Sequence, residues 1–406
     1  MTKGKKNSYA YILGGILLSF FILLLIKPES VLESGQKALE LCLNIIIPSL
    51  FPFFVVSRLI LNTGVIHTIS RVFKPIMKPL FNLPGSAAFP LIAGWFSGYP
   101  AGAKYTVDLH EKKMLSQNEA QRLLAFCNNS GPLFIVGAVG TGYFQSPELG
   151  LMLLLSHLLA SITIGIGAGL ISRKKELSEK KTMLGLVDKQ TKPKLFEKKT
   201  KYELAEKKTK KAKFEPAEKQ TAFNGKILSD AVTNSVMVLL QICGTIFFFA
   251  VAVQALETAG VFNFISKLVG LLTGSKNVYS EITEIFIAGS LEITYGLYIL
   301  SRAISIPVTF KILLAALFCG FGGFSVHTQV TGLCPSHFKF KSYYTGKLLH
   351  GIIASAYTGL FLINRSIPVM KSSFSLHDAD FSRVLLIIYA LLLIFIILYI
   401  ISIRRD

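Results

Sequence analysis

The sequence contains few charged residues and few cysteines for its length. Asp, Glu, Lys and Arg make up 16% of its 406 residues, whereas hydrophobic residues make up 51%. A chain with so little charge and so much apolar sequence is typical of polytopic membrane proteins and not of soluble enzymes. The cysteines form no CxxC pair and have no histidine at metal-binding spacing, so we expect neither a disulfide framework nor a zinc site. They are Cys42, Cys127, Cys243, Cys319 and Cys334.

Sequence motifs for catalysis are also missing. The chain has no glycine-rich phosphate loop, no nucleophile triad and no pair of carboxylates at catalytic spacing. We therefore expect a protein that is not an enzyme and that uses no cofactor and no metal.

Positive charge is abundant overall, but it is concentrated in one segment. The formal net charge is +20, and half of it comes from residues 172–226, which contain 18 basic and 8 acidic residues. The sequences FEKKT, AEKKT and AEKQT follow one another there without the apolar stripe of a packed helix. We interpret this segment as a Lys-rich cytoplasmic linker that is either solvated or attracted to anionic lipid, and we expect no nucleic-acid partner.

Long apolar runs divide the rest of the chain into membrane units. We assign residues 1–30 to an N-terminal transmembrane anchor, 31–171 to a first repeat, 227–364 to a second repeat and 365–406 to a C-terminal transmembrane helix. The positive-inside rule places both termini and the linker in the cytoplasm and leaves the basic stretch Lys104–Arg122 outside. The predicted spans are Tyr9–Ile26, Ile45–Asn62, Ser86–Ala103, Leu149–Ile171, Ile227–Gln254, Ile282–Leu300, Tyr343–Ile363 and Phe381–Ile403.

Two further apolar segments are interrupted by glycine and polar residues. The first, Phe126–Gly142, reads FCNNSGPLFIVGAVGTG, and the second, Phe318–Gly332, reads FCGFGGFSVHTQVTG. The apolar halves on either side of each interruption are about half of the ~20 residues that a crossing needs. A broken helix survives in a membrane only where protein or water satisfies its backbone. We therefore predict two re-entrant hairpins, with Ser116 and Ser336 on opposite faces of the membrane.

The two halves of the chain repeat each other. Short matches recur at offsets of 196, 195 and 192 residues, among them Ile92-Ala93-Gly94 against Ile287-Ala288-Gly289. On the topology above, the two repeats are inverted. Inverted repeats with broken helices at matching positions are typical of secondary transporters, in which the substrate binds near the midplane. The predicted fold is therefore an all-α polytopic membrane protein with two inverted repeats and re-entrant helical hairpins.

The polar residues at the interruptions are the candidates for substrate binding. Their amides, hydroxyls and imidazole can form hydrogen bonds, and a half-helix that begins at Gly131-Pro132 would attract an anion with its N-terminus. Helix capping and ordinary packing are the alternatives for these residues. The candidates are Ser97, Gly98, Tyr99, Asn128, Asn129, Ser130, Gly131, Gly322, Gly323, Ser325, His327 and Gln329.

Glu292 stands out because a carboxylate in mid-span costs about 2.5–3.5 kcal/mol on insertion scales. In the alignment of the two repeats, Glu292 corresponds to Ser97. We predict that Glu292, together with Thr294, binds a coupling proton or cation. The alternative is a structural ion pair with Lys104 or Arg122.

Four stretches of this sequence resemble the sporulation integral membrane protein YlbJ family, whose halves are nucleoside-recognition or "gate" domains. They are IPSLFPFFV (Ile47–Val55), GWFSGYPAGAK (Gly94–Lys104), NNSGPLFIVGAVGTG (Asn128–Gly142) and GFGGFSVHTQ (Gly320–Gln329). The similarity covers Ser34–Leu362, apart from the linker.

This resemblance implies a relation to concentrative nucleoside transporters and the export of dipicolinic acid from the mother cell across the outer forespore membrane. The expected partners are membrane lipid and a small anionic solute, with a homo-oligomer possible. A carrier of nucleosides or other carboxylates is the alternative within transport. A sporulation scaffold that acts through its basic linker is the alternative from another class.

Overall fold

The computed structural model describes residues 3–62, 65–187, 225–273 and 278–363, and every regular element within these ranges is helical. The chain order is α1 (Lys3–Ile26), α2 (Pro28–Leu41), the π-helical η1 (Cys42–Ile46), α3 (Ile47–Asn62), α4 (Val65–Phe81), the short 3₁₀-helix η2 (Gly85–Ala87), α5 (Ala88–Ser97), α6 (Ala101–Glu111), α7 (Gln117–Cys127), the π-helical η3 (Leu133–Tyr143), α8 (Pro147–Val187), α10 (Gly225–Thr258), α11 (Val261–Thr273), α12 (Val278–Leu291), α13 (Ile293–Arg302), α14 (Val308–Phe321), α15 (Gly323–Leu333) and α16 (Lys341–Ile363). The predicted span Phe381–Ile403 and residues 188–224 of the linker lie outside these ranges.

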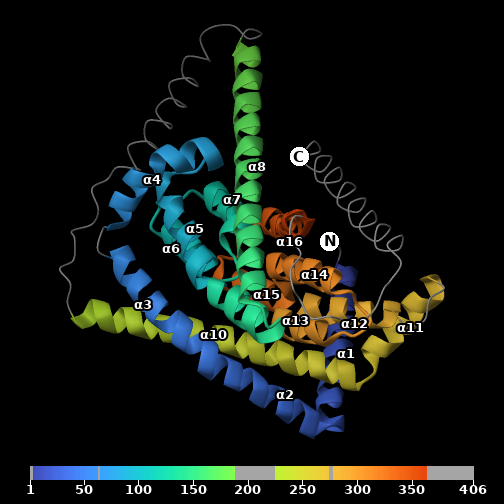
Figure 1. Cartoon of the computed structure of the whole chain (residues 1–406). Helices are drawn as coiled ribbons and strands as arrows, with labels where there is room; N and C mark the ends of the chain where they lie inside the picture. The colour runs from blue at the N-terminus through green and yellow to red at the C-terminus, as the bar shows by residue number, and fades with distance from the viewer. Residues whose placement is uncertain (1–2, 63–64, 188–224, 274–277, 364–406) are drawn as a thin grey trace.

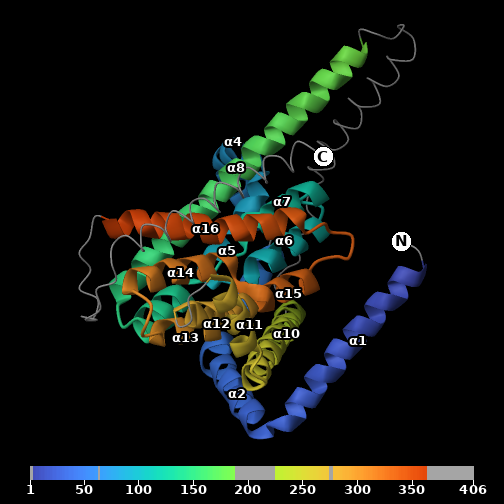
Figure 2. The ribbon, with the colours of Figure 1, turned by 90° about the vertical axis from the view of Figure 1, so that its right-hand side faces the viewer.

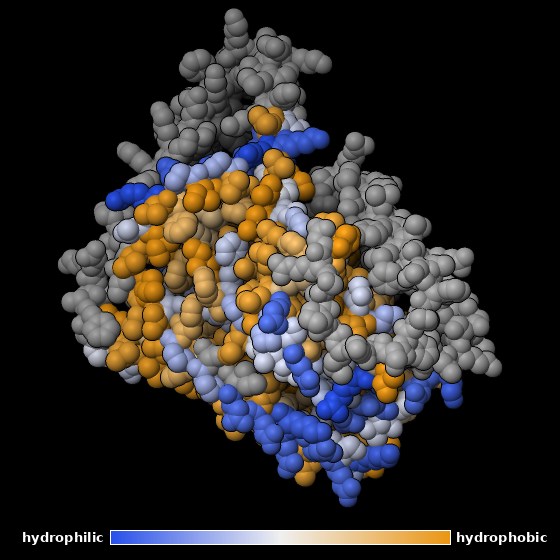
Figure 3. All heavy atoms as spheres, in the orientation of Figure 1, coloured by the Kyte–Doolittle hydropathy of each residue, from blue (hydrophilic) through white to orange (hydrophobic). Residues whose placement is uncertain are grey.

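Several helices are long and apolar enough to cross a membrane. Four qualify among the described residues, namely Pro147–Glu179, Gly225–Thr258, Val308–Leu333 and Lys341–Ile363, and α3 with α4 forms a fifth candidate as a sharply bent pair. One face of the molecule carries a broad band of hydrophobic residues with hydrophilic residues above and below it (Figure 3). The chain is therefore a polytopic membrane protein, as its composition predicts.

The segment predicted as the first hairpin is an interrupted span instead. In the middle of α7, Arg122 donates to Ser172 in the second half of α8, and in η3 Gly140 packs against Gly150 near the beginning of α8. The segment therefore runs along α8 in one direction. From Gly150 to Ser172, α8 rises about 33 Å at roughly 1.5 Å per residue. That distance matches the hydrocarbon thickness of a bilayer. A hairpin would bring both of its ends to the same end of α8.

The second predicted hairpin is also wrong. Helices α14 and α15 together form the single candidate span Val308–Leu333. The interruption is confined to Gly322 and Gly323, whose φ angles are 92° and 72°. Glycine adopts this left-handed conformation without steric cost, so the helix unwinds at one point and resumes without reversing its direction.

These two spans change the predicted topology of the basic stretch Lys104–Arg122. The amide of Gln117, at the start of α7, donates to the carbonyl of His337 in the loop after α15, at 3.1 Å. Arg122 meets Ser172, where the predicted linker begins. The basic stretch therefore lies on the same side as the linker and not on the opposite side. This arrangement removes the conflict with the positive-inside rule that the hairpins created.

The two broken spans run in opposite directions. The start of α7 lies beside the loop that follows α15. The end of η3, at Tyr143, contacts Tyr298 of α13 and belongs to the same hydrophobic cluster as Ile306 and Phe310 at the beginning of α14. Each of the two spans thus begins on the side where the other ends.

The two long helices that follow the broken spans pack against each other inside the molecule. Helix α8 extends well beyond the other helices (Figure 1), and α16 crosses it within the body of the protein (Figure 2). At the crossing the rings of His157 and His350 stack at 4.3 Å between centroids, and the His350 Nε2 donates to the His157 carbonyl at 2.9 Å. Both helices belong to the core that positions the interruptions.

Candidate functional site

The first-half interruptions meet each other because glycines permit a very close backbone approach. A Cβ atom at Gly94 or Gly102 would lie 1.7 or 2.0 Å from the carbonyl oxygen of Cys127, far inside any real contact. A Cβ atom at Gly98 would lie 2.7 Å from the backbone nitrogen of Gly131. The glycines of α5, α6 and the turn between them therefore allow this broken helix to pack directly onto the break between α7 and η3.

The interruptions of the two halves are joined at one carbonyl group. The Tyr99 hydroxyl donates to the carbonyl oxygen of Cys319 at 2.5 Å, and the Ser130 hydroxyl donates to the same oxygen at 3.1 Å. Cys319 lies in the last turn of α14, where backbone carbonyls lack partners within the helix. Two side chains from the first half thus cap the broken helix of the second half.

A cavity of about 150 Å³ lies at this junction. Apolar side chains of α3, α10 and η3 line the rest of its wall, among them Phe53, Ile242 and Phe134. Nine of the fourteen candidate residues line it, and they come from both halves of the chain. They are Ser97, Gly98, Tyr99, Ser130, Gly131, Glu292, Thr294, Ser325 and Gln329.

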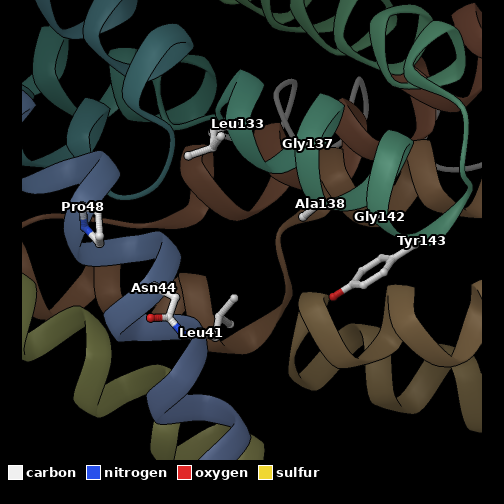
Figure 4. Close-up of a pocket in the computed structure, with 8 residues that line it drawn as sticks. All are labelled: Leu41, Asn44, Pro48, Leu133, Gly137, Ala138, Gly142 and Tyr143. Carbon is white, nitrogen blue, oxygen red and sulfur yellow. The ribbon is translucent and has the colours of Figure 1, made fainter.

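A wider groove of about 630 Å³ lies next to this cavity. The two share the lining residues Leu41, Leu133 and Ala138, so the cavity and the groove are adjacent. Figure 4 shows that the groove separates the segment of α2, η1 and α3 from η3, with Asn44 on one side and Tyr143 on the other. Most of the residues that line the groove are apolar.

The other five candidates lie behind the cavity wall. Asn128 and Asn129 are buried, and the Asn129 amide donates to the carbonyl of Phe126. Gly322 packs against the Tyr99 hydroxyl, and Gly323 packs against the Gly289 carbonyl. The ring of His327 contacts four aromatic residues, and its Nδ1 lies 2.9 Å from the Tyr343 hydroxyl.

The predicted anion site at the start of η3 is largely occupied by the protein itself. The backbone N–H groups of Phe134 and Ile135 both donate to the Gly131 carbonyl. The N–H group of Ser130 donates to the Nε2 of His157 at 3.1 Å. These three groups are therefore not free to bind a solute.

Glu292 caps a helix and is not part of an ion pair with either predicted partner. Its carboxylate accepts the N–H of Tyr295 at 2.8 Å and thereby caps α13. Lys104 instead pairs with Asp108 at 2.8 Å, and Arg122 donates to Ser172 and to a backbone carbonyl. The ion-pair alternative for Glu292 is therefore wrong, while its place on the cavity wall agrees with the repeat alignment.

Two buried side chains at the junction, Lys347 and His350, were missed in the sequence. Lys347 of α16 is 0% exposed, and its ammonium donates to the Asn128 carbonyl at 2.9 Å. His157 and His350 are also buried, and neither ring has a partner at its Nδ1 within the described part of the chain. The available signal was the presence of Lys347 inside an apolar span, since an ionisable residue there is a functional candidate by default.

Comparison with known proteins identifies the chain as a gate-domain membrane protein. The family model described as "Gate: Nucleoside recognition" matches residues 43–184, which include the interruptions of the first half. More specifically, the chain belongs to the family of the sporulation integral membrane protein YlbJ. It is 33% identical over 355 residues to that protein from Bacillus subtilis (strain 168), and the alignment covers 85% of this chain and 82% of the relative. No solved structure matches the chain.

Proposed function

We propose that this protein transports a small anionic aromatic solute, and that dipicolinic acid is that solute. The observation that carries the proposal is the cavity between interrupted helices of both halves, with hydroxyl, amide and aromatic groups on its wall. Breaks at matching positions in spans of opposite direction support an inverted repeat. In such transporters the solute binds between the repeats, and movement of one repeat against the other changes its access.

The size of the cavity favours a single ring over a nucleoside. At about 150 Å³ it is smaller than the roughly 300–1,000 Å³ of pockets that hold drug-sized ligands. Dipicolinic acid is one pyridine ring with two carboxylates, whereas a nucleoside carries a base and a ribose. The family resemblance points to the same solute and, with it, to a location in the outer forespore membrane with the linker on the cytoplasmic side.

Glu292 supports a role for protons in this transport. Its carboxylate lies on the wall of the cavity, where it would repel an anionic solute. Uptake of a proton by Glu292 removes that repulsion, so we infer that anion and proton move together. Glu292→Gln mimics the protonated carboxyl group, and transport by this variant should lose its dependence on a pH gradient while solute binding remains.

Uptake by the purified full-length protein in liposomes tests the function. We expect accumulation of radiolabelled dipicolinate that unlabelled dipicolinate inhibits and nucleosides do not. Ser130→Ala and Asn129→Ala should abolish uptake at unchanged protein abundance. Normal uptake by both variants would refute the site, and accumulation of nucleosides in place of dipicolinate would refute the substrate.

A further inference from the structure

We propose that Lys347 is the counter-charge that binds a carboxylate of the transported solute. This inference rests on the proposed transport function and deepens it, because it assigns the recognition of the anion to one residue. Lys347 lies behind the cavity and not on its wall.

The ammonium group lies one aromatic ring away from the cavity. Its Nζ is 5.2 Å from the centroid of the Tyr99 ring, and Tyr99 lines the cavity. The Nζ also donates to the carbonyl of Asn128, the first residue of the break between α7 and η3. Lys347 thus contacts both first-half interruptions from a helix of the second half.

No anion among the residues that the structure describes neutralises this charge. Lys347 takes part in none of the ion pairs found among the described residues. An ammonium has three N–H donors, and one of them is bound to Asn128. A buried charge without a partner is costly, so it is retained where a ligand supplies the opposite charge.

Tyr99 connects anion binding to the contact between the halves. Its ring covers the ammonium, while its hydroxyl donates to the Cys319 carbonyl across the junction. A carboxylate that reaches Lys347 must displace the ring, and this breaks the hydrogen bond to the second half. Binding of the solute therefore replaces a contact that holds the two halves together.

The ammonium of Lys347 has no counterpart in the first repeat. His157 and His350 are 193 residues apart and stack on each other, and the same offset matches Lys347 with Leu154 of α8. At this position only the second half provides an ammonium, so Lys347 pairs with one of the two equivalent carboxylates of the solute.

The test compares charge with hydrogen bonding at this position. Lys347→Gln keeps a donor for the Asn128 carbonyl but removes the charge, and Lys347→Met removes both. Lys311→Met is the matched control, because Lys311 also donates to a backbone carbonyl, that of Ser301 at 3.2 Å, but lies at the start of α14. The ligands are dipicolinate and its neutral diamide, pyridine-2,6-dicarboxamide, and binding to the full-length protein in detergent is measured by calorimetry.

We expect wild type and Lys311→Met to bind dipicolinate alike, and both Lys347 variants to bind it about 100-fold more weakly, as for a buried charge that loses its partner. Binding of the diamide should not change, and the thermal midpoint of the unliganded variants should stay equal or rise. Unchanged dipicolinate affinity in Lys347→Gln would overturn the inference while leaving the transport function intact. If the wild type binds and transports neither dipicolinate nor any other carboxylate, the proposed function fails, and this inference falls with it.

Discussion

The carbonyl of Cys319 offers a quantitative test of the junction between the halves. It accepts hydrogen bonds from Tyr99 and Ser130, at 2.5 and 3.1 Å, and the residue is 1% exposed. Tyr99→Phe or Ser130→Ala removes one donor and leaves the other in place. Each single change should therefore cost about 0.5–1.5 kcal/mol, the net contribution of an ordinary hydrogen bond.

The double variant should cost more than the sum of the two single variants. With both donors gone, a buried carbonyl is left without a partner, which costs about 1–3 kcal/mol in desolvation. We therefore expect a coupling energy of roughly 1 kcal/mol, within the range for residues that share a partner. The measurement is reversible unfolding of the purified variants in mixed micelles of lipid and detergent, with a complete double-mutant cycle.

A second cycle provides the control. Thr358 donates to the Ala354 carbonyl within α16 and shares no partner with Tyr99, so Tyr99→Phe and Thr358→Val should add within about 0.3–0.5 kcal/mol. If Tyr99→Phe and Ser130→Ala are equally additive, the Cys319 carbonyl finds another partner, and the argument that this group joins the halves is refuted.

Two further outcomes follow from the packing and from the direction of the spans. Gly94→Ala should lower the thermal midpoint of the protein, because its Cβ would overlap the Cys127 carbonyl and overpacking costs about 1–3 kcal/mol. The control is Gly167→Ala in α8, which should raise the midpoint slightly, because a Cβ there would have no atom within 4 Å. Equal midpoints for the two variants would contradict the close approach of Gly94 to Cys127. Single cysteines at positions 116 and 336, in place of Ser116 and Ser336, should react with an impermeant maleimide from the same face of the membrane. Labelling from opposite faces would restore the hairpins.

The sequence predicted the broken helices but not their path through the membrane. The interruptions at Ser97–Pro100 and Asn128–Pro132 are visible as glycine, proline and polar residues inside apolar runs. A hairpin and an interrupted span have the same two apolar halves, so composition cannot separate them. The difference appears only in the packing of Arg122 and Gly140 against opposite ends of one stretch of α8.

Burial of individual polar residues was equally hidden from the sequence. Lys347 is close to the start of its predicted span, where a lysine commonly extends its ammonium to the membrane surface. Its burial depends on α7, since Gly346 packs against Ala125 and brings Lys347 to the break after that helix. His157 and His350, in turn, become a pair only because α8 and α16 cross.

The interruptions of the two halves differ in chemistry. In the first half, hydroxyl groups donate across the junction to a carbonyl of the second half. The two ionisable groups proposed to act on an anion, Glu292 and Lys347, both belong to the second half. At the matching positions the first half has Ser97 and Leu154. If the second half moves relative to the first during transport, it carries both charges with it. The solute would then stay with its counter-charge, while the hydrogen bonds to the first half break and re-form on each side of the membrane.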